Sequence, residues 1–252
     1  MTQTVNKAAV ARAFGRAAQS YNQHAELQRL CGEELYSLAR HPQQKRVLDA
    51  GCGPGWFSAR WRSAGNHVTA LDLSAEMLNQ ARLEDTADDY RQGDIEALPF
   101  ADAAFDICWS NLAVQWCSDL RLALGEMQRV TRPGGQVLFS TLAAGSLHEL
   151  NQAWRGLDLP APVNRFLSEA QTQEAGGALG LRLRPQTLTL AFPDVLSALR
   201  SLKGIGATHL HQGRRDGLLS RPHLNQLAQG WPRDERGFLL SYHLLYGVID
   251  CE

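Results

Sequence analysis

The chain has 252 residues, of which 44% are hydrophobic, and its formal net charge is -1. This length is enough for one α/β domain with an added lobe, and the charge argues against broad nucleic-acid binding, which requires a basic surface. No apolar run approaches the ~18 residues of a membrane span. The five cysteines form no C-x-x-C pair and show no histidine spacing typical of zinc, so we expect reduced thiols, no metal site and a cytoplasmic location.

The first 40 residues predict a cap of two helices. An apolar stripe at helical spacing consists of Val10, Phe14, Ala17 and Tyr21. A second stripe follows in residues 27–38. We expect both helices to pack on a sheet or to fold over its ligand-binding edge. Tyr21 is then either a core residue or a cover for the ligand.

A glycine-rich loop follows the first buried strand. Val47 and Leu48 are typical of a strand entering a parallel sheet, and the segment from Asp49 to Gly55 places three glycines at alternate positions. Because glycine accepts left-handed backbone and has no Cβ, such a loop can lie against a ligand. The helical pattern that starts at Trp56 adds a helix N-terminus, which favours polar or anionic groups. The alternative is a glycine turn that binds nothing.

Acidic residues follow the next two strands. Asp72 ends a buried strand at 68–71 and lies 21 residues after Gly51. At this spacing, nucleotide-binding units place a carboxylate on ribose hydroxyls. Asp94 lies near the end of a third predicted strand, at 90–95.

Strands and helices alternate as far as Leu142. A fourth strand is predicted at 105–109 and a fifth at 136–141. This rhythm predicts a doubly wound, mostly parallel α/β sheet, whose ligand groups lie at the carboxyl ends of the strands. Polar groups follow four of these strands, at Asp49, Asp72, Asp94 and Ser110-Asn111. Their common position disfavours a glycine turn without a ligand.

The alternation fails beyond Leu142. Residues 188–192 predict a sixth strand, and residues 239–249 predict one or two strands that close the sheet. We expect a single domain. Its segments are a helical cap at 1–40, a cofactor-binding core at 41–142, substrate-side insertions forming a helical lid at 143–236, and a closing strand at 237–252.

The loop pattern Asp-x-Gly-x-Gly-x-Gly, followed by Asp72 and by Gly93-Asp94-Ile95, resembles the class I S-adenosylmethionine-dependent methyltransferases. The resemblance implies a Rossmann-like sheet of seven strands, with S-adenosylmethionine as methyl donor and S-adenosylhomocysteine as product. It implies that the glycine loop lies beside the methionine part, that Asp72 binds the ribose and that Asp94 with Ile95 binds the adenine. The implied cofactor contacts are Asp49, Gly51, Gly53, Asp72, Leu73, Met77, Asp94, Ile95, Asn111 and Leu112.

A dehydrogenase that uses NAD is the alternative for this core. Such enzymes have G-x-G-x-x-G, whereas this chain has Gly51-x-Gly53-x-Gly55. No hydride-transfer constellation is evident either. The methyltransferase interpretation is therefore favoured.

Three further blocks resemble the malonyl-acyl carrier protein O-methyltransferases of biotin synthesis. They are residues 14–18 with Tyr21, residues 110–117 and residues 202–209. The resemblance implies methyl esterification of the free carboxylate of a malonyl thioester, carried by an acyl carrier protein or by CoA. The ester hides a charge, so that fatty-acid enzymes can elongate the primer towards pimeloyl. Neither nucleic acid nor membrane is expected as a partner.

The implied reaction needs no general base, because a carboxyl group with a pKa near ~4 is already ionised. What remains is in-line placement and the exclusion of water by a lid, for which the N-terminal helices with Tyr21 are the candidate. Selection of a malonyl carboxylate requires a cation or several donors. The candidates are Arg16, Arg165, Lys203 and His209. His209 is equally well explained as a hydrogen-bonded core histidine.

A basic region lies between residues 178 and 221, with seven Arg or Lys against two acids. It is either a solvated face or a docking surface for an acidic partner. Acyl carrier proteins are strongly acidic. We therefore expect a docking surface formed by Arg200, Lys203, Arg214 and Arg215.

Two other functions are compatible with this sequence. One is methyl transfer by the same fold to a quinone or to a free dicarboxylate. The other is a non-catalytic regulator that binds S-adenosylmethionine, since binding alone would require the same cofactor residues.

Overall fold

The computed structural model describes residues 5–157, 165–204 and 220–252, the side chains of 203 and 204 excepted. The core is one mixed sheet in the order β3-β2-β1-β4-β5-β8-β6, with β7 beside β8. Strands β1 to β5 are parallel, β8 runs antiparallel to β5, and β6 runs antiparallel to β8. The strands are β1 (Arg46–Ala50), β2 (His67–Asp72), β3 (Asp89–Gln92), β4 (Phe105–Asn111), β5 (Thr131–Leu142), β6 (Arg182–Phe192), β7 (Arg233–Asp234) and β8 (Gly237–Asp250). The predicted doubly wound, mostly parallel sheet is confirmed. Besides its seven main strands, the sheet contains the two-residue strand β7, which pairs with β8.

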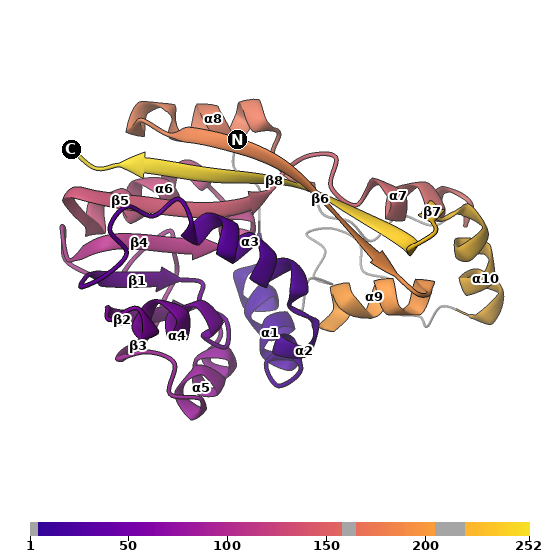
Figure 1. Ribbon diagram of the computed structural model, residues 1–252, viewed down its shortest axis with the longest axis horizontal. Helices are drawn as coiled ribbons and strands as arrows, with labels where there is room; N and C mark the ends of the chain where they lie inside the picture. The colour runs from indigo at the N-terminus through magenta and orange to yellow at the C-terminus, as the bar shows by residue number, and fades with distance from the viewer. Residues whose placement is uncertain (1–4, 158–164, 205–219) are drawn as a thin grey trace.

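Helices cover both faces of the sheet (Figure 1). Residues of α3 and α4 join one hydrophobic cluster, and residues of α6 join the cluster on the other face. The α-helices are α1 (Lys7–Ala17), α2 (Tyr21–His24), α3 (Glu26–Tyr36), α4 (Trp56–Ser63), α5 (Ala75–Leu83), α6 (Leu120–Val130), α7 (His148–Arg155), α8 (Glu169–Gly176), α9 (Val195–Gly204) and α10 (Arg221–Gly230). Two 3-10 helices are η1 (Val114–Trp116) and η2 (Gly177–Leu179).

Apolar runs explain the central strands. Val47 and Leu48 of β1 are both fully buried although they point to opposite faces, as expected of a parallel strand covered by helices on each side. Trp61 of α4 packs edge-on against Trp109 of β4, with ring centroids 5.3 Å apart. This aromatic contact fixes α4, and with it the glycine loop that precedes α4, against the centre of the sheet.

The cap differs from its prediction. Instead of one helix from Val10 to Tyr21, α1 ends at Ala17 and the short α2 begins at Tyr21. The hydroxyl of Ser20 donates to the Ala17 carbonyl at 3.3 Å, an alternative to the helical hydrogen bond that serine often offers to the backbone. The break frees Tyr21 from the stripe of α1 and turns it towards the glycine loop.

The outer strands are longer than predicted. The predicted strand at 188–192 is the second half of β6, and the predicted closing segment at 239–249 is the single strand β8. The first half of β6 carries Pro185 and exposed charged side chains, features that edge strands tolerate and central strands do not. In Figure 1, β6 and β8 extend beyond the parallel strands towards α7, α9 and α10.

Candidate active site

The glycine loop leaves β1 in a left-handed conformation. Gly51 has φ +81°, and its amide donates to the Leu71 carbonyl of the neighbouring strand at 2.7 Å. A Cβ at this position would come within 2.4 Å of the Cβ of Ala113. The backbone therefore needs glycine here both for its φ value and for its close approach to the segment after β4.

Asp72 connects the glycine loop to the start of α5. Its Oδ2 accepts a hydrogen bond from the Gly53 amide at 2.9 Å, and its Oδ1 accepts one from the Ser74 amide at 2.8 Å. Burial raises the pKa of Asp72, and these backbone donors partly oppose that rise. The carboxylate thus positions two loops at the edge of the sheet.

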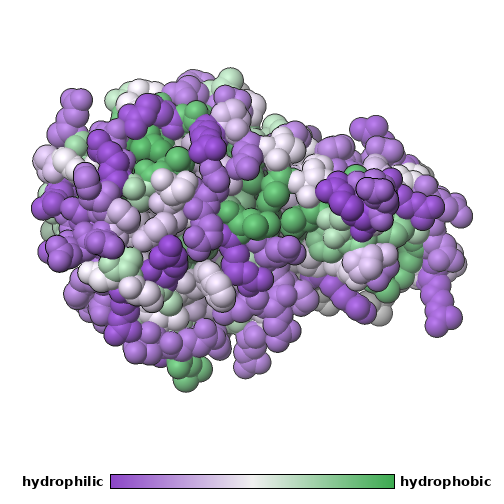
Figure 2. Space-filling view, in the orientation of Figure 1, coloured by the Kyte–Doolittle hydropathy of each residue, from purple (hydrophilic) through white to green (hydrophobic). Residues whose placement is uncertain are grey.

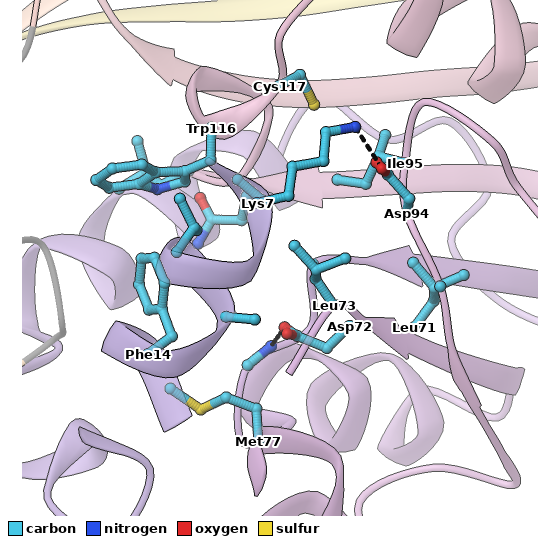
Figure 3. Close-up of a pocket in the computed structure, with 18 of the residues that line it drawn as sticks. Lys7, Phe14, Leu71, Asp72, Leu73, Met77, Asp94, Ile95, Trp116 and Cys117 are labelled. Carbon is cyan, nitrogen blue, oxygen red and sulfur yellow. Dashed lines mark hydrogen bonds and ion pairs between the residues drawn. The ribbon is translucent and has the colours of Figure 1, made fainter. Parts of the chain in front are cut away.

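A cavity of about 690 Å³ lies between α1 and the carboxyl ends of the strands (Figure 3). Its lining includes nine of the predicted cofactor contacts, and Tyr21 besides. The nine are Gly51, Gly53, Asp72, Leu73, Met77, Asp94, Ile95, Asn111 and Leu112.

Helix α1 covers the cavity with Lys7, Val10 and Phe14. The Lys7 ammonium forms ion pairs with Asp94 and with Glu96, and Figure 3 shows its side chain reaching across to Asp94. Desolvation lowers the pKa of Lys7, but the two carboxylates outweigh it and raise the pKa overall. The ion pairs hold α1 over the strand ends.

A smaller cavity of about 410 Å³ adjoins the first, since Tyr21, Gly51 and Asn111 line both. Three buried polar atoms of residues that line it have no hydrogen-bond partner. They are Asn22 Oδ1, Gln28 Oε1 and Trp109 Nε1. Unpaired buried polar groups are costly, so this arrangement favours a polar ligand that supplies both donors and an acceptor.

Asp49 also lines the smaller cavity, beneath the glycine loop. Its Oδ2 accepts a hydrogen bond from the Ser58 hydroxyl at 2.6 Å. Burial raises the pKa of the Asp49 carboxyl to about 7, against the opposing effect of Ser58 and with a further contribution from the charge of Asp72. A cationic ligand group in this cavity would favour the ionised form.

The ring of Tyr21 lies over the glycine loop. A Cβ built on Gly53 would be 3.9 Å from the ring, which is ordinary van der Waals contact. Burial, with the nearby charge of Asp72, raises the pKa of Tyr21 further above its usual value, so the phenol is neutral at physiological pH. An uncharged side chain therefore lies where the two cavities adjoin.

Relatives of this chain match it along its whole length. A malonyl-acyl carrier protein O-methyltransferase from Erwinia billingiae (strain Eb661) is 74% identical over 250 residues, covering 99% of this chain and 100% of that protein. A protein of the same name from Salmonella typhimurium (strain LT2) is 52% identical, covering 98% of both. The chain belongs to the malonyl-acyl carrier protein O-methyltransferase family. Residues 48–139 also match the model of a methyltransferase domain.

Solved structures show that this family member has the fold of known methyltransferases. The YcgJ protein of Bacillus subtilis superposes with a TM-score of 0.60 at 22% identity, over 88% of this chain and 98% of that one. A geranyl diphosphate C-methyltransferase from Streptomyces coelicolor A3(2), solved with S-adenosyl-L-homocysteine, gives 0.50 at 20% identity, over 90% and 81%. The predicted methyltransferase fold is confirmed, and the chain is a methyltransferase.

The two predicted carboxylate-binding residues whose side chains the structure describes, Arg16 and Arg165, do not share a cavity. Arg16 is exposed on α1 and is absent from the lining of both cavities, while Arg165 lines a separate cavity beyond η1. Lys203 lies on α9, but its side chain is outside the described part of the structure, as is the whole of His209. Their roles stay predictions.

Residues of the cap that the sequence did not single out also line the site. Lys7 shares one face of α1 with Val10 and Phe14, and this helical spacing is the signal that could have revealed it. The sequence carries no such signal for Asn22 and Gln28. Only the folded structure shows that their side-chain oxygens are buried without a hydrogen-bond partner and that both residues line the cavity. Asp49 lies in the smaller cavity and not in the larger one.

Proposed function

We propose that this chain transfers a methyl group from S-adenosylmethionine to the free carboxylate of a malonyl thioester on an acyl carrier protein. The product is a malonyl methyl ester that serves as primer for pimeloyl and biotin synthesis. The observation that carries the proposal is the high sequence identity, over the full length, to proteins named for this reaction.

The two adjoining cavities fit S-adenosylmethionine. The larger one is mostly apolar and presents the carboxylates of Asp72 and Asp94, which accept hydrogen bonds from hydroxyl and amino groups and repel phosphate. We assign Asp72 to the ribose, and Asp94, Ile95 and Met77 to the adenine. The smaller cavity, with its unpaired polar atoms, matches the ammonium and carboxylate of an amino acid. Bound there, S-adenosylmethionine supplies a methyl group on a sulfonium, an activated leaving group.

The chain then has to position and shield the acceptor. A malonyl carboxylate is ionised at neutral pH, so no residue needs to remove a proton. Tyr21 and α1 cover the site and exclude water, which strengthens electrostatic interactions within it. One modest cationic contact to the acceptor is enough, because a tight ion pair would weaken the nucleophile. Arg16, Arg165, Lys203 and His209 are the candidates.

We assign carrier docking to the basic residues on and after α9. Arg200 is exposed on that helix, and Lys203, Arg214 and Arg215 follow it in the sequence. Arg182 and Arg184 of β6 are left out, because they form ion pairs with Asp250 and Glu34. An acidic carrier attracted to such a surface would bind less well at high salt.

A cytoplasmic location is the natural one for this reaction. All five cysteines are free thiols, which persist in a reducing compartment. No helix in the described ranges is long and apolar enough to cross a membrane.

Methyl transfer to defined acceptors tests the proposal. We expect radiolabel from S-adenosylmethionine to enter malonyl-acyl carrier protein and malonyl-CoA, and not acetyl-acyl carrier protein, which lacks the free carboxylate. Transfer to a quinone or to a free dicarboxylate in preference to the thioesters would contradict the proposed acceptor. Binding of S-adenosylmethionine without methyl transfer to any of these acceptors would favour the alternative of a non-catalytic regulator.

A further inference from the structure

A further cleft, of about 830 Å³, lies between the helical cap and the outer strands. Helices α2 and α3 form one side of it, and β6, β8 and α9 form the other. Leu190, Phe192 and Tyr242 supply an apolar wall, while His24 and Arg200 add polar groups. Figure 2 shows hydrophobic surface gathered in the narrow middle of the molecule, where the cap meets β6.

The cleft adjoins the smaller cavity at Gln28. This residue lines both the cleft and the smaller cavity beside Asp49. Its backbone carbonyl accepts a hydrogen bond from Asn111 Nδ2 at 2.9 Å, which holds it at the carboxyl end of β4. Its buried Oε1 has no partner. Rotation of the amide can present either an acceptor or an N–H donor at this junction.

We propose that this cleft holds the phosphopantetheine arm of the thioester substrate, with the malonyl carboxylate at the Gln28 end and the phosphate at Arg200. The inference rests on the proposed function and adds the path by which the acceptor reaches the methyl group. The cleft is much larger than a free three-carbon dicarboxylate requires. The apolar side chains of Leu190, Phe192 and Tyr242 in its wall can pack against the alkyl parts of the arm.

Polar groups along the cleft match the rest of the arm. Ser197 and Ser201 place hydroxyl groups along its α9 side, where amide groups of the arm can form hydrogen bonds. The guanidinium of Arg200 is exposed and offers the planar fork that suits a phosphate. The acids nearby are Glu26, which lines the same cleft, and Asp194, whose pKa Arg200 helps to lower.

Three acceptors distinguish the contribution of the arm to binding from that of the malonyl group, which all three carry. Malonyl-acyl carrier protein and malonyl-CoA carry the whole arm, and malonyl-N-acetylcysteamine ends after the first amide and has no phosphate. Leu190→Trp and Ser201→Trp are designed to fill the cleft from two different elements, β6 and α9. Leu196→Trp is the matched control, because Leu196 is 42% exposed on the same helix and does not line the cleft.

Filling the cleft should raise KM for the two long acceptors by roughly tenfold or more, equivalent to at least about 1.4 kcal/mol, and affect the truncated thioester much less. The dissociation constant of S-adenosylmethionine, measured by calorimetry, should stay the same, and Leu196→Trp should match wild type. Two filling variants are used so that the comparison can still be made if one of them fails to fold. Wild-type KM values in a folded filling variant, or an equal rise for all three acceptors, would overturn the inference.

Arg200→Ala tests the phosphate end, with Arg155→Ala on α7 as its exposed control. We expect KM to rise several-fold for both phosphate-bearing acceptors and to be unchanged for the truncated thioester. A rise for the carrier alone would leave Arg200 only the carrier-docking role of the proposed function and overturn its contact with the arm. If wild-type enzyme methylated none of the three acceptors, the proposed function would fail, and the cleft assignment with it.

Discussion

The backbone amide of Gly53 donates a hydrogen bond of 2.9 Å to the carboxylate of Asp72. The same carboxylate accepts from the amide of Ser74, so one side chain fixes both the glycine loop and the start of α5. A ligand that used Asp72 would therefore meet a group already aligned by two backbone donors.

Asp72→Asn should weaken binding of S-adenosylmethionine by roughly tenfold or more, because an amide has only one acceptor oxygen. One of the two backbone donors then loses its partner, at a cost of about 1–3 kcal/mol. Calorimetric titration with the cofactor measures the effect. Asp89→Asn, which removes an exposed carboxylate from β3, is the control and should bind as wild type does.

Gly51→Ala should destabilise the fold more than Gly65→Ala. Both glycines have left-handed backbone, with φ +81° and +83°, so each substitution carries a strain of about 1–2 kcal/mol. Only at Gly51 does the new Cβ also meet another atom, Ala113 Cβ at 2.4 Å, whereas Gly65 has open space. Urea denaturation of the two variants isolates the clash. Equal losses of stability would show that the approach of Gly51 to Ala113 is not tight.

Asp49→Asn should make the fold more stable at pH 8 and have little effect at pH 4. The pKa of Asp49 is about 7 in the folded protein, chiefly through burial, against ~4 when unfolded. Between pH ~4 and about 7, the folded state therefore keeps a proton on Asp49 that the unfolded state has lost. The stability that this contributes is complete below pH ~4 and is lost as pH rises to about 7. Asn can still accept from Ser58 and never ionises.

Urea denaturation at several pH values checks this expectation. Asp102→Asn, an exposed carboxylate, provides the control for general charge effects. A stability difference between Asp49→Asn and wild type that does not change between pH 4 and 8 would contradict the raised pKa.

Tyr21→Ala should lower kcat/KM by roughly tenfold or more while changing the free energy of unfolding comparatively little, because the ring covers the glycine loop at the edge of the cavities. Tyr36→Ala is the matched control from the same cap. Its half-buried ring packs against the buried Trp61, with ring centroids 4.5 Å apart, so stability should fall more and activity less. Steady-state kinetics and urea denaturation of both variants give the comparison. An unchanged rate in Tyr21→Ala would remove Tyr21 from the mechanism.

The core of the fold was predictable because its signals are local. Apolar runs such as Val47-Leu48 and acids placed directly after strands, such as Asp72, indicate the parallel sheet and the edge at which its strands end. The first half of β6 was not predictable, because Pro185 and the charged residues beside it are not typical of a buried strand. The break between α1 and α2 also escaped, since the stripe continues through it to Tyr21.

Pairings between distant residues were the other part that sequence could not provide. Lys7 forms an ion pair with Asp94, which lies 87 residues further along the chain. This contact depends on how α1 crosses the strand ends. The unpaired oxygens of Asn22 and Gln28 likewise depend on the packing of the cap against β4. The donor-site candidates line two adjoining cavities, because they come from one continuous stretch of strands and loops. The described acceptor candidates Arg16 and Arg165 come from distant segments and do not share a cavity.

The central claim concerns the group that receives the methyl, and intact-protein mass spectrometry of malonyl-acyl carrier protein tests it most directly. After incubation with S-adenosylmethionine bearing a labelled methyl group, we predict the addition of one methyl per carrier, located on the malonyl group and released by ester hydrolysis. Acetyl-acyl carrier protein should gain none. A methyl group on the carrier polypeptide, or no gain on the malonyl form while the cofactor still binds, would contradict the account.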